Sequence, residues 1–254
     1  KAGGGIYTKT ADVAADLVGK IEFDLPEDDS RNPAAVADNV GDNVGDIAGM
    51  GADLFDSYVA SLVAAMLLSY SILRLNVGYT EMEAWIFASF PPIISASGLL
   101  ASMFGIFIIR KFVKNNPGGA LNLGTLVATV LYIGISALFT WFLTMQPYIK
   151  PMVYYPDQIP IEMRLWRNWL SGVFGVCVGL LIGFTTDYYT NDEKKPVQET
   201  AAAAQKGHAL TILTGFSYGL YSIVPPALGI ITAMILSWWM DGIYGIANAS
   251  VGML

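Results

Sequence analysis

The sequence predicts an all-α, polytopic membrane protein: a transmembrane helix bundle with about six spans or part-spans. The residues are 54% hydrophobic and only 14% charged, and the mean hydropathy is +0.50, whereas a soluble domain carries about 25% charged residues. Several apolar runs are long enough to cross about 30 Å of hydrocarbon. Short polar loops join these runs, as expected of helices that satisfy their own backbone groups in lipid.

Charge and cysteine content exclude other classes of protein. The net charge is −7, and the sequence has no basic stripe with interleaved aromatic residues, so we expect no nucleic-acid partner. The one cysteine, Cys177, lies in an apolar run and gives no disulfide framework. We interpret residues 1–254 as a single membrane domain from inside a longer protein. Residues 1–75 would form two site-bearing helices with cytosolic extensions, and 76–254 further transmembrane helices.

The stretch DNVGDNVGDIAGMGADLFD carries a ladder of carboxylates. On an α-helix, residues four apart lie one above another, and residues three or seven apart stay close to the same face. The sequence therefore predicts one acidic stripe, roughly 27 Å long at about 1.5 Å per residue, that continues into an apolar run. Its members are Asp38, Asp42, Asp46, Asp53 and Asp56.

This ladder is costly without compensation, because like charges four residues apart destabilise a helix and an acidic side chain at membrane depth is expensive. A solvated acidic face would need neither the interleaved glycines nor the apolar continuation. A calcium loop of the EF-hand type takes its ligands at alternate residues, whereas the spacing here is four. We therefore interpret the ladder as a helix that binds divalent cations at its water-exposed end and passes a cation along the end that is buried in the membrane.

Four charged residues near the start of the chain share another helical face, because they recur at spacings of three and four. They are Lys9, Asp12, Asp16 and Lys20. Two interpretations stay open: a surface salt-bridge ladder, or carboxylates that bind metal beside lysines that meet an anion. The glycines at 3–5 lack the Gly-Lys-Ser/Thr ending of a phosphate loop, so they are only a weak nucleotide signature.

The rest of the chain alternates apolar spans with polar loops. The basic loops at 110–114 and 186–207 fall on one side, and the positive-inside rule makes this side the cytoplasm. The acidic cluster is therefore expected to be cytosolic. Pro225-Pro226 predicts a kink, and Trp238-Trp239 an interfacial belt. After the ladder helix we expect spans at 84–109, 121–145, 169–184 and 212–240, and a further one from 243 onward.

Two stretches carry a resemblance to a known family: GGGIYTKTADVAADLVGKIE at 3–22 and EDDSRNPAAVADNVGDNVGDIAGMGADLF at 27–55. They resemble the membrane-integral, ion-pumping inorganic pyrophosphatases, and the likeness continues more weakly through 186–207 and the next span. The resemblance implies a homodimeric enzyme of about sixteen transmembrane helices. Such an enzyme hydrolyses magnesium pyrophosphate at the cytosolic face and pumps H⁺ or Na⁺ across the membrane.

Carried over position by position, the resemblance gives these residues roles. Asp46 would be the catalytic residue that orients and deprotonates the attacking water, and Lys9 and Lys20 would bind pyrophosphate. The Mg²⁺ ligands would be Asp12, Asp16, Asp42, Asp38 and Glu27. The ion gate would consist of Lys1, Asp53, Asp56 and Ser57. Position 1 is Arg in the family pattern, and Lys keeps the charge but loses the bidentate fork.

The resemblance implies Mg²⁺ as the cofactor and leaves K⁺ open as an activator. The pumped ion is also open, because Asp56 stands where sodium pumps of the family usually have Glu, which is one methylene longer. The chain would lie in a plasma membrane or in the membrane of an acidic organelle. Its partners would be pyrophosphate, the lipid bilayer and a second copy of the protein.

A different class of protein accounts for part of the pattern: a non-hydrolytic cation channel or transporter with an Asp-lined path. It explains Asp46, Asp53 and Asp56. It does not explain Lys9 beside Asp12, because a lysine repels a permeant cation. In the resembling family, helices beyond residue 254 complete the active site, so residues 1–254 alone are expected to be inactive.

Overall fold

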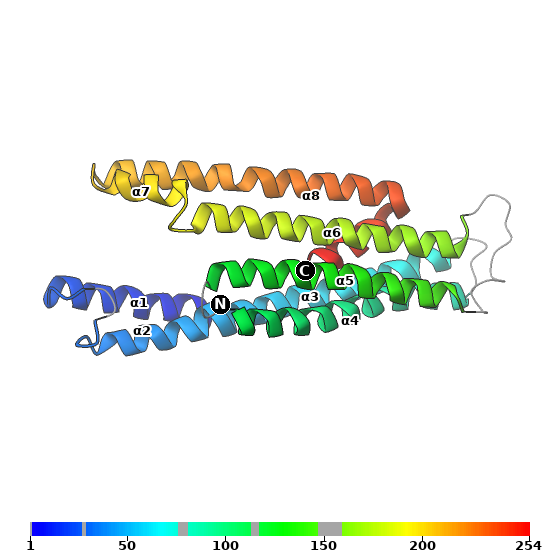
Figure 1. The fold of residues 1–254 in the computed structure, drawn as a ribbon, viewed down its shortest axis with the longest axis horizontal. Helices are drawn as coiled ribbons and strands as arrows, with labels where there is room; N and C mark the ends of the chain where they lie inside the picture. The colour runs from blue at the N-terminus through cyan, green and yellow to red at the C-terminus, as the bar shows by residue number, and fades with distance from the viewer. Residues whose placement is uncertain (1, 27–28, 76–80, 113–116, 147–158) are drawn as a thin grey trace. The chain divides into compact units, whose positions relative to one another are not determined.

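A computed structural model of the chain describes residues 2–26, 29–75, 81–112, 117–146 and 159–254, and the regular structure there is helical (Figure 1). Five helices in these ranges are long and apolar enough to cross a membrane. They comprise Ala34–Ser71, Glu81–Lys111, Gly118–Thr144, Ile161–Ala204 and His208–Met253. The prediction of a polytopic all-α membrane protein is confirmed. Parts of the polar loops, residues 113–116 and 147–158, lie outside the described residues.

The contacts divide the chain into two compact units, residues 1–60 and residues 61–254. The first unit contains α-helices and π-helices, the latter with hydrogen bonds from residue i to i+5. Its elements are η1 (Ala2–Tyr7), α1 (Thr8–Leu17), η2 (Val18–Glu22), α2 (Ala34–Asp42), η3 (Asn43–Gly49) and the first part of α3 (Met50–Leu75). The single membrane domain expected over 1–254 stays a prediction.

The first unit has two arms: the first consists of η1, α1 and η2, and the second of α2, η3 and the start of α3. The two arms approach each other through glycines. A Cβ built on Gly4 would lie 3.0 Å from the Cα of Gly49, and one built on Gly45 would lie 2.9 Å from the carbonyl oxygen of Gly4. Gly41 and Gly45 also lie against Thr8. The glycines between the ladder carboxylates therefore form the contact between the arms, and any larger residue at Gly45 would force them apart.

The ladder helix differs from the single α-helix predicted over residues 38–56, because Asn43–Gly49 is π-helical. Glycine has low helix propensity and leaves the backbone free to adopt other hydrogen-bond patterns. This segment contains Gly45 and Gly49, and both lie against the main chain of Gly4. The π segment therefore coincides with the place where the two arms are closest.

The second unit contains α4 (Glu81–Phe112), α5 (Pro117–Thr144), α6 (Ile161–Thr190), α7 (Lys195–Ala204) and α8 (His208–Met253). Helix α6 packs most extensively against α8, and α4 against α5. Phe87 and Phe90 of α4, Leu165 of α6 and Tyr244 of α8 belong to one buried core cluster. The Tyr244 hydroxyl donates a hydrogen bond of 2.6 Å to the carbonyl oxygen of Phe87, which joins α8 to α4.

Helix α8 is interrupted near its end. The non-helical dihedral angles occur at Asp241 (φ −150°, ψ 37°) and Gly242 (φ 59°, ψ −138°), and not at the pair Pro225-Pro226. The positive φ of Gly242 is readily adopted only by glycine. The break separates the predicted span over 212–240 from the part-span expected after 243.

A buried ion pair holds this break against α6. The Nε of Arg164 donates to the two carboxylate oxygens of Asp241 at 2.7 and 2.9 Å, and the Nδ2 of Asn168 donates to the same carboxylate at 2.6 Å. The Nδ2 of Asn248 in turn donates to the Oδ1 of Asn168 at 3.1 Å. The guanidinium of Arg164 also lies 5.0 Å from the centroid of the Phe87 ring. These contacts satisfy charges that would otherwise be costly within apolar helices.

Candidate functional site

The candidate site lies where the chain reverses between α1 and α2. After η2, Asp24 adopts a left-handed backbone conformation with φ 49°, which Asp tolerates better than most residues. The N–H of Leu25 then donates to the carbonyl oxygen of Gly19 at 2.8 Å. This turn brings α2 back along α1, so that charged residues of both helices come together.

The connection between the helices carries its own ion pair. The Nη2 of Arg31 lies 2.7 Å from Oδ2 of Asp29, and the Nε and the backbone N–H of Arg31 donate to Oδ1 at 3.0 and 2.9 Å. The side-chain hydrogen bond from Arg31, followed by the backbone one, lowers the pKa of Asp29 to about 2. The Asp29 carboxylate is therefore charged at every pH at which the protein would work.

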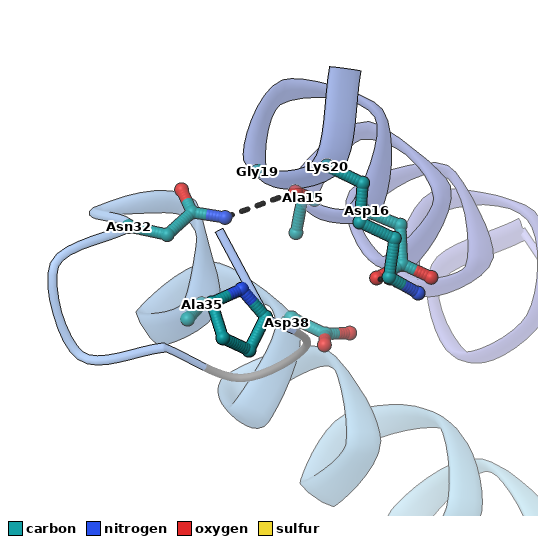
Figure 2. Close-up of a pocket in the computed structure, with 8 residues that line it drawn as sticks. Ala15, Asp16, Gly19, Lys20, Asn32, Ala35 and Asp38 are labelled. Carbon is teal, nitrogen blue, oxygen red and sulfur yellow. Dashed lines mark hydrogen bonds and ion pairs between the residues drawn. The ribbon is translucent and has the colours of Figure 1, made fainter. Parts of the chain in front are cut away.

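Asn32 ties this connection to both helices. Its Nδ2 donates to the carbonyl oxygen of Ala15 in α1 at 2.9 Å, which Figure 2 shows as a dashed line. Its Oδ1 accepts the N–H of Ala34 at 3.0 Å, and its carbonyl oxygen accepts the N–H of Ala35 at 3.1 Å. Asn32 is only 7% exposed, so these bonds are shielded from water.

A small pocket beside Asn32 joins the two charged faces (Figure 2). Asp16 and Lys20 line it from the first arm and Asp38 from α2. The Nζ of Lys20 lies 3.3 Å from Oδ1 of Asp16, and both side chains are about half exposed. The cavity volume is about 10 Å³, close to the space that one water molecule needs. The pocket therefore brings two predicted metal ligands and a predicted substrate lysine together without itself enclosing a substrate-sized space.

Lys9 connects the first helix with the ladder. Its ammonium forms an ion pair with Asp12. The pKa of Lys9 is raised, first by the hydrogen bond to Asp12 and then by the charge of Asp12; burial opposes this rise, and the charges of Asp38 and Asp42 add smaller contributions that raise the pKa. Two ladder carboxylates on α2 therefore act on a lysine of α1.

The ion pairs Lys9–Asp12 and Lys20–Asp16 match the contacts of a salt-bridge ladder on α1. Exposed pairs of this kind contribute little to stability. These ion pairs are the contacts that the salt-bridge interpretation predicts. Asp38 of α2 also lies in the pocket with Asp16 and Lys20, as the metal-and-anion interpretation requires. The roles of these residues in binding metal and pyrophosphate stay predictions.

The donor set fits magnesium, although no group of three or more His, Cys, Asp or Glu side chains in the described part of the chain could hold a metal ion by itself. Magnesium is usually bound by one or two carboxylates together with water and substrate phosphates. Asp16 and Asp38 line one pocket from different helices, which is the number and chemistry of protein ligands that such a site uses. Asp12 forms an ion pair with Lys9, and the charge of Asp42 contributes to the raised pKa of Lys9.

Three predicted site residues are not placed as side chains. Lys1 and Glu27 lie outside the described residues. The backbone of Asp46 belongs to η3, and its side chain lies outside what the structure describes. The catalytic role of Asp46, the metal role of Glu27 and the gate role of Lys1 stay predictions.

The predicted gate residues on α3 are exposed within the first candidate span. Asp53, Asp56 and Ser57 are exposed in this chain, and they belong to the apolar helix Ala34–Ser71. Asp53 and Asp56 are three residues apart and so lie close to one face of the helix. This placement puts two carboxylates on a helix that is long and apolar enough to cross a membrane, and their role as an ion gate stays a prediction.

Two residues that shape the pocket, Gly19 and Asn32, were not predicted from the sequence. Asn32 precedes Pro33, and an Asn before Pro is an ordinary signal of a turn, which gave no hint of a contact with Ala15. A Cβ on Gly19 would lie 2.8 Å from Nδ2 of Asn32. The glycine therefore makes room for the amide, a requirement that only the folded hairpin reveals.

The described helices and the lysine–aspartate pocket define a multi-spanning membrane protein with a candidate site for a metal and an anion at a helix junction. The family described as Inorganic H+ pyrophosphatase matches residues 1–254. This chain belongs to that family, which confirms the resemblance found in the two motif stretches.

Pyrophosphate-energized pumps of both cation types are among its relatives. The chain is 42% identical, over 99% of its length, to a K(+)-insensitive pyrophosphate-energized proton pump of Caldanaerobacter subterraneus subsp. tengcongensis. It is 38% identical, over its full length, to a K(+)-stimulated pyrophosphate-energized sodium pump of Thermotoga maritima. It spans 35% of the first relative and 36% of the second, so it corresponds to about a third of such a protein.

Proposed function

We propose that this chain, within a full-length protein of its relatives' size, takes part in the hydrolysis of magnesium pyrophosphate at the cytosolic face and in the coupled pumping of H⁺ or Na⁺. The observation that carries this proposal is the meeting of lysines and aspartates from two helices. Lys9 responds to the charges of Asp38 and Asp42, and Lys20 shares a pocket with Asp16 and Asp38. A site that contains both lysines and aspartates suits a metal-bound polyanion better than a cation alone.

The proposed chemistry needs little covalent help from the protein. Phosphoryl transfer depends on positioning and on neutralising the charge of the phosphate oxygens. Mg²⁺ held by Asp12, Asp16, Asp38, Asp42 and Glu27 would supply that neutralisation, with K⁺ as a further activator in the potassium-stimulated case. Lys9 and Lys20 would pair with the remaining substrate charge. Asp46 would orient the attacking water and accept its proton.

Coupling would use the carboxylates further along the same helix. Asp53 lies seven residues beyond Asp46, about 10 Å at α-helical rise. Asp56 and Ser57 would complete a gate with Lys1. The chain would lie in a plasma membrane or an acidic organelle membrane as part of a homodimer. The relatives of comparable identity include both a proton pump and a sodium pump, and the gate residues of this chain would select the ion.

A non-hydrolytic cation channel or transporter is the alternative. The two exposed carboxylates Asp53 and Asp56 on an apolar helix favour it, because acidic residues at membrane depth commonly mark ion paths. The alternative leaves Lys9 and Lys20 unexplained, since both would repel a cation that approached the ladder.

Orthophosphate release from pyrophosphate tests the proposal, measured in membranes that contain the full-length protein with Mg²⁺ present. We expect hydrolysis by the unmodified protein and a loss of about 10²–10⁴-fold in Asp46→Asn, as for removal of a general base. Asp192→Asn is the matched control, because Asp192 is exposed and lies in the connection between α6 and α7. Cation flux without orthophosphate release would instead support the channel.

A further inference from the structure

Asn32 occupies the junction of three segments. The Val18 N–H that caps α1 is shared between the carbonyl oxygens of Ala14 and Ala15, and the π segment η2 begins at this residue. The Ala15 carbonyl oxygen also accepts the Nδ2–H of Asn32, 17 residues further along the chain. The amide of Asn32 therefore completes the hydrogen bonding of a carbonyl at the helix transition.

The backbone and side chain of Asn32 form four hydrogen bonds. The N–H donates to the carbonyl oxygen of Asp29 at 2.8 Å, and the carbonyl oxygen accepts from Ala35. The side chain donates to Ala15 and accepts from Ala34. Of the short side chains, only an amide offers a donor and an acceptor on neighbouring atoms. An Asp at this position would place a carboxylate oxygen against the Ala15 carbonyl oxygen.

Gly19 is fitted to this amide. The heavy atoms that a Cβ on Gly19 would meet within 4 Å are Nδ2 of Asn32 at 2.8 Å and Cγ of Asn32 at 3.7 Å. A contact of 2.8 Å requires the neighbour to move. Replacing Gly19 by Ala would therefore displace the Asn32 amide while leaving Asn32 itself in the sequence.

Asn32 links the two helices that carry Asp16 and Asp38. Asp16 follows Ala15 directly, and Asp38 lies one helical turn beyond Ala34, so the two helices that Asn32 joins are the ones that carry these residues. Asp16, Asp38 and Asn32 line the same pocket (Figure 2). An uncharged residue that links both helices therefore lies in the same pocket as the two carboxylates.

We infer that Asn32 is a positioning residue of the candidate site: by joining Ala15 to the start of α2, it sets the separation of Asp16 and Asp38 and hence the affinity for magnesium. This inference rests on the proposed function, because it assigns the two carboxylates to a magnesium site. Mg²⁺ demands near-ideal octahedral geometry at about 2.0–2.1 Å, so a displaced carboxylate weakens binding steeply. Loss of residues that orient metal ligands typically costs about 10–100-fold in metal affinity or activity.

Magnesium titration of the full-length protein tests the inference with two readouts. The first is the Mg²⁺ concentration for half-maximal pyrophosphate hydrolysis, and the second is the Mg²⁺-dependent rise in melting temperature without pyrophosphate. In Asn32→Ala we expect both midpoints to move to about 10–100-fold higher Mg²⁺ with kcat at saturating Mg²⁺ close to that of the unmodified protein, and a lower melting temperature in chelator because two side-chain hydrogen bonds are lost. A purely structural role would lower the melting temperature and leave the magnesium midpoints in place.

Gly19→Ala is the second, independent variant, and it decides the matter if Asn32→Ala does not fold. It should shift the magnesium midpoints in the same direction as Asn32→Ala, because its Cβ displaces the same amide. Gly3→Ala is the matched control, since a Cβ there meets nothing within 4 Å in the described structure. Unshifted midpoints in folded Asn32→Ala or in Gly19→Ala would overturn the inference. An unmodified protein without magnesium-dependent hydrolysis would instead overturn the proposed function.

Discussion

Lys9 is a side chain whose ionisation depends on two helices. Its hydrogen bond to Asp12, the charge of Asp12, and the charges of Asp38 and Asp42 together raise its pKa above the ordinary value of 10.5. The charged form is therefore favoured in the folded protein. Because the folded pKa is raised, this contribution to stability is complete below the unfolded pKa and is lost as pH rises through the folded value.

The raised pKa predicts slow acylation of Lys9 by amine-reactive reagents at alkaline pH, because only the neutral amine reacts. Asp12→Asn should speed acylation of Lys9, since it removes the first two causes of the shift. Lys206 is exposed and distant in sequence, so its acylation rate should be unchanged by the substitution. Peptide mass spectrometry of timed samples measures both rates, and equal Lys9 rates in the two proteins would contradict the electrostatic account.

At the scale of elements, the sequence predicted that Asp38 and Asp42 share a helical face, but not that a π segment separates them from Asp53 and Asp56. The spacing of Asp38 and Asp42 placed them together correctly, and Lys9 of α1 responds to both. The π segments were not predicted, and two of them, η1 and η3, coincide with the place where Gly45 and Gly49 meet the main chain of Gly4. The periodicity of a sequence predicts the faces of a single helix, whereas the glycine contact forms between two helical segments, η1 and η3.

Two further contacts could not be predicted from the sequence: the hydrogen bond from Asn32 to Ala15 and the ion pair between Arg164 and Asp241. Each joins residues far apart in sequence, and their meeting depends on where the chain reverses, at Asp24 in one case and at Gly242 in the other. A charged residue in an apolar helix does indicate that a partner exists. It does not say which residue the partner is.

Breaking the Arg164–Asp241 pair should destabilise the protein strongly. Arg164→Ala leaves a largely buried carboxylate without its partner, which typically costs about 3–5 kcal/mol. Replacing both residues by apolar ones, Arg164→Met with Asp241→Leu, should recover most of this loss, because no buried charge remains. Unfolding of the full-length protein in detergent measures both effects. Lys195→Met at an exposed pair is the control, and a single variant as stable as this control would contradict the assignment.

At the scale of the whole molecule, the chain accounts for about a third of its relatives' length, 35–36%. The helix Ala34–Ser71 is apolar enough to cross a membrane, and it exposes Asp53 and Asp56 in this chain. Exposed carboxylates at membrane depth need partners or water. The gate can therefore be assessed only in the full-length protein.

Transport in sealed vesicles with the full-length protein should identify the pumped ion. Asp56 is one methylene shorter than Glu, and Na⁺ needs several closely placed oxygens, so we expect H⁺ transport by the unmodified protein and a shift toward Na⁺ in Asp56→Glu. Pyrophosphate-driven ²²Na⁺ uptake that persists with a protonophore measures sodium pumping. Such uptake by the unmodified protein would exclude the proton assignment, and an unchanged preference in Asp56→Glu would remove Asp56 as the selector.

The π segment η3 lies between the carboxylates of α2 and those of α3. Asp42 ends α2, Asn43–Gly49 is π-helical, and Asp53 belongs to α3. Each i→i+5 ring holds one residue more than an i→i+4 ring, and one residue of α-helix corresponds to about 100° of rotation and about 1.5 Å of rise. The phase of the helix after η3 therefore differs from the phase that residue counting predicts. Gaining or losing one residue within this segment would turn Asp53 and Asp56 toward different neighbours while leaving Asp38 and Asp42 in place.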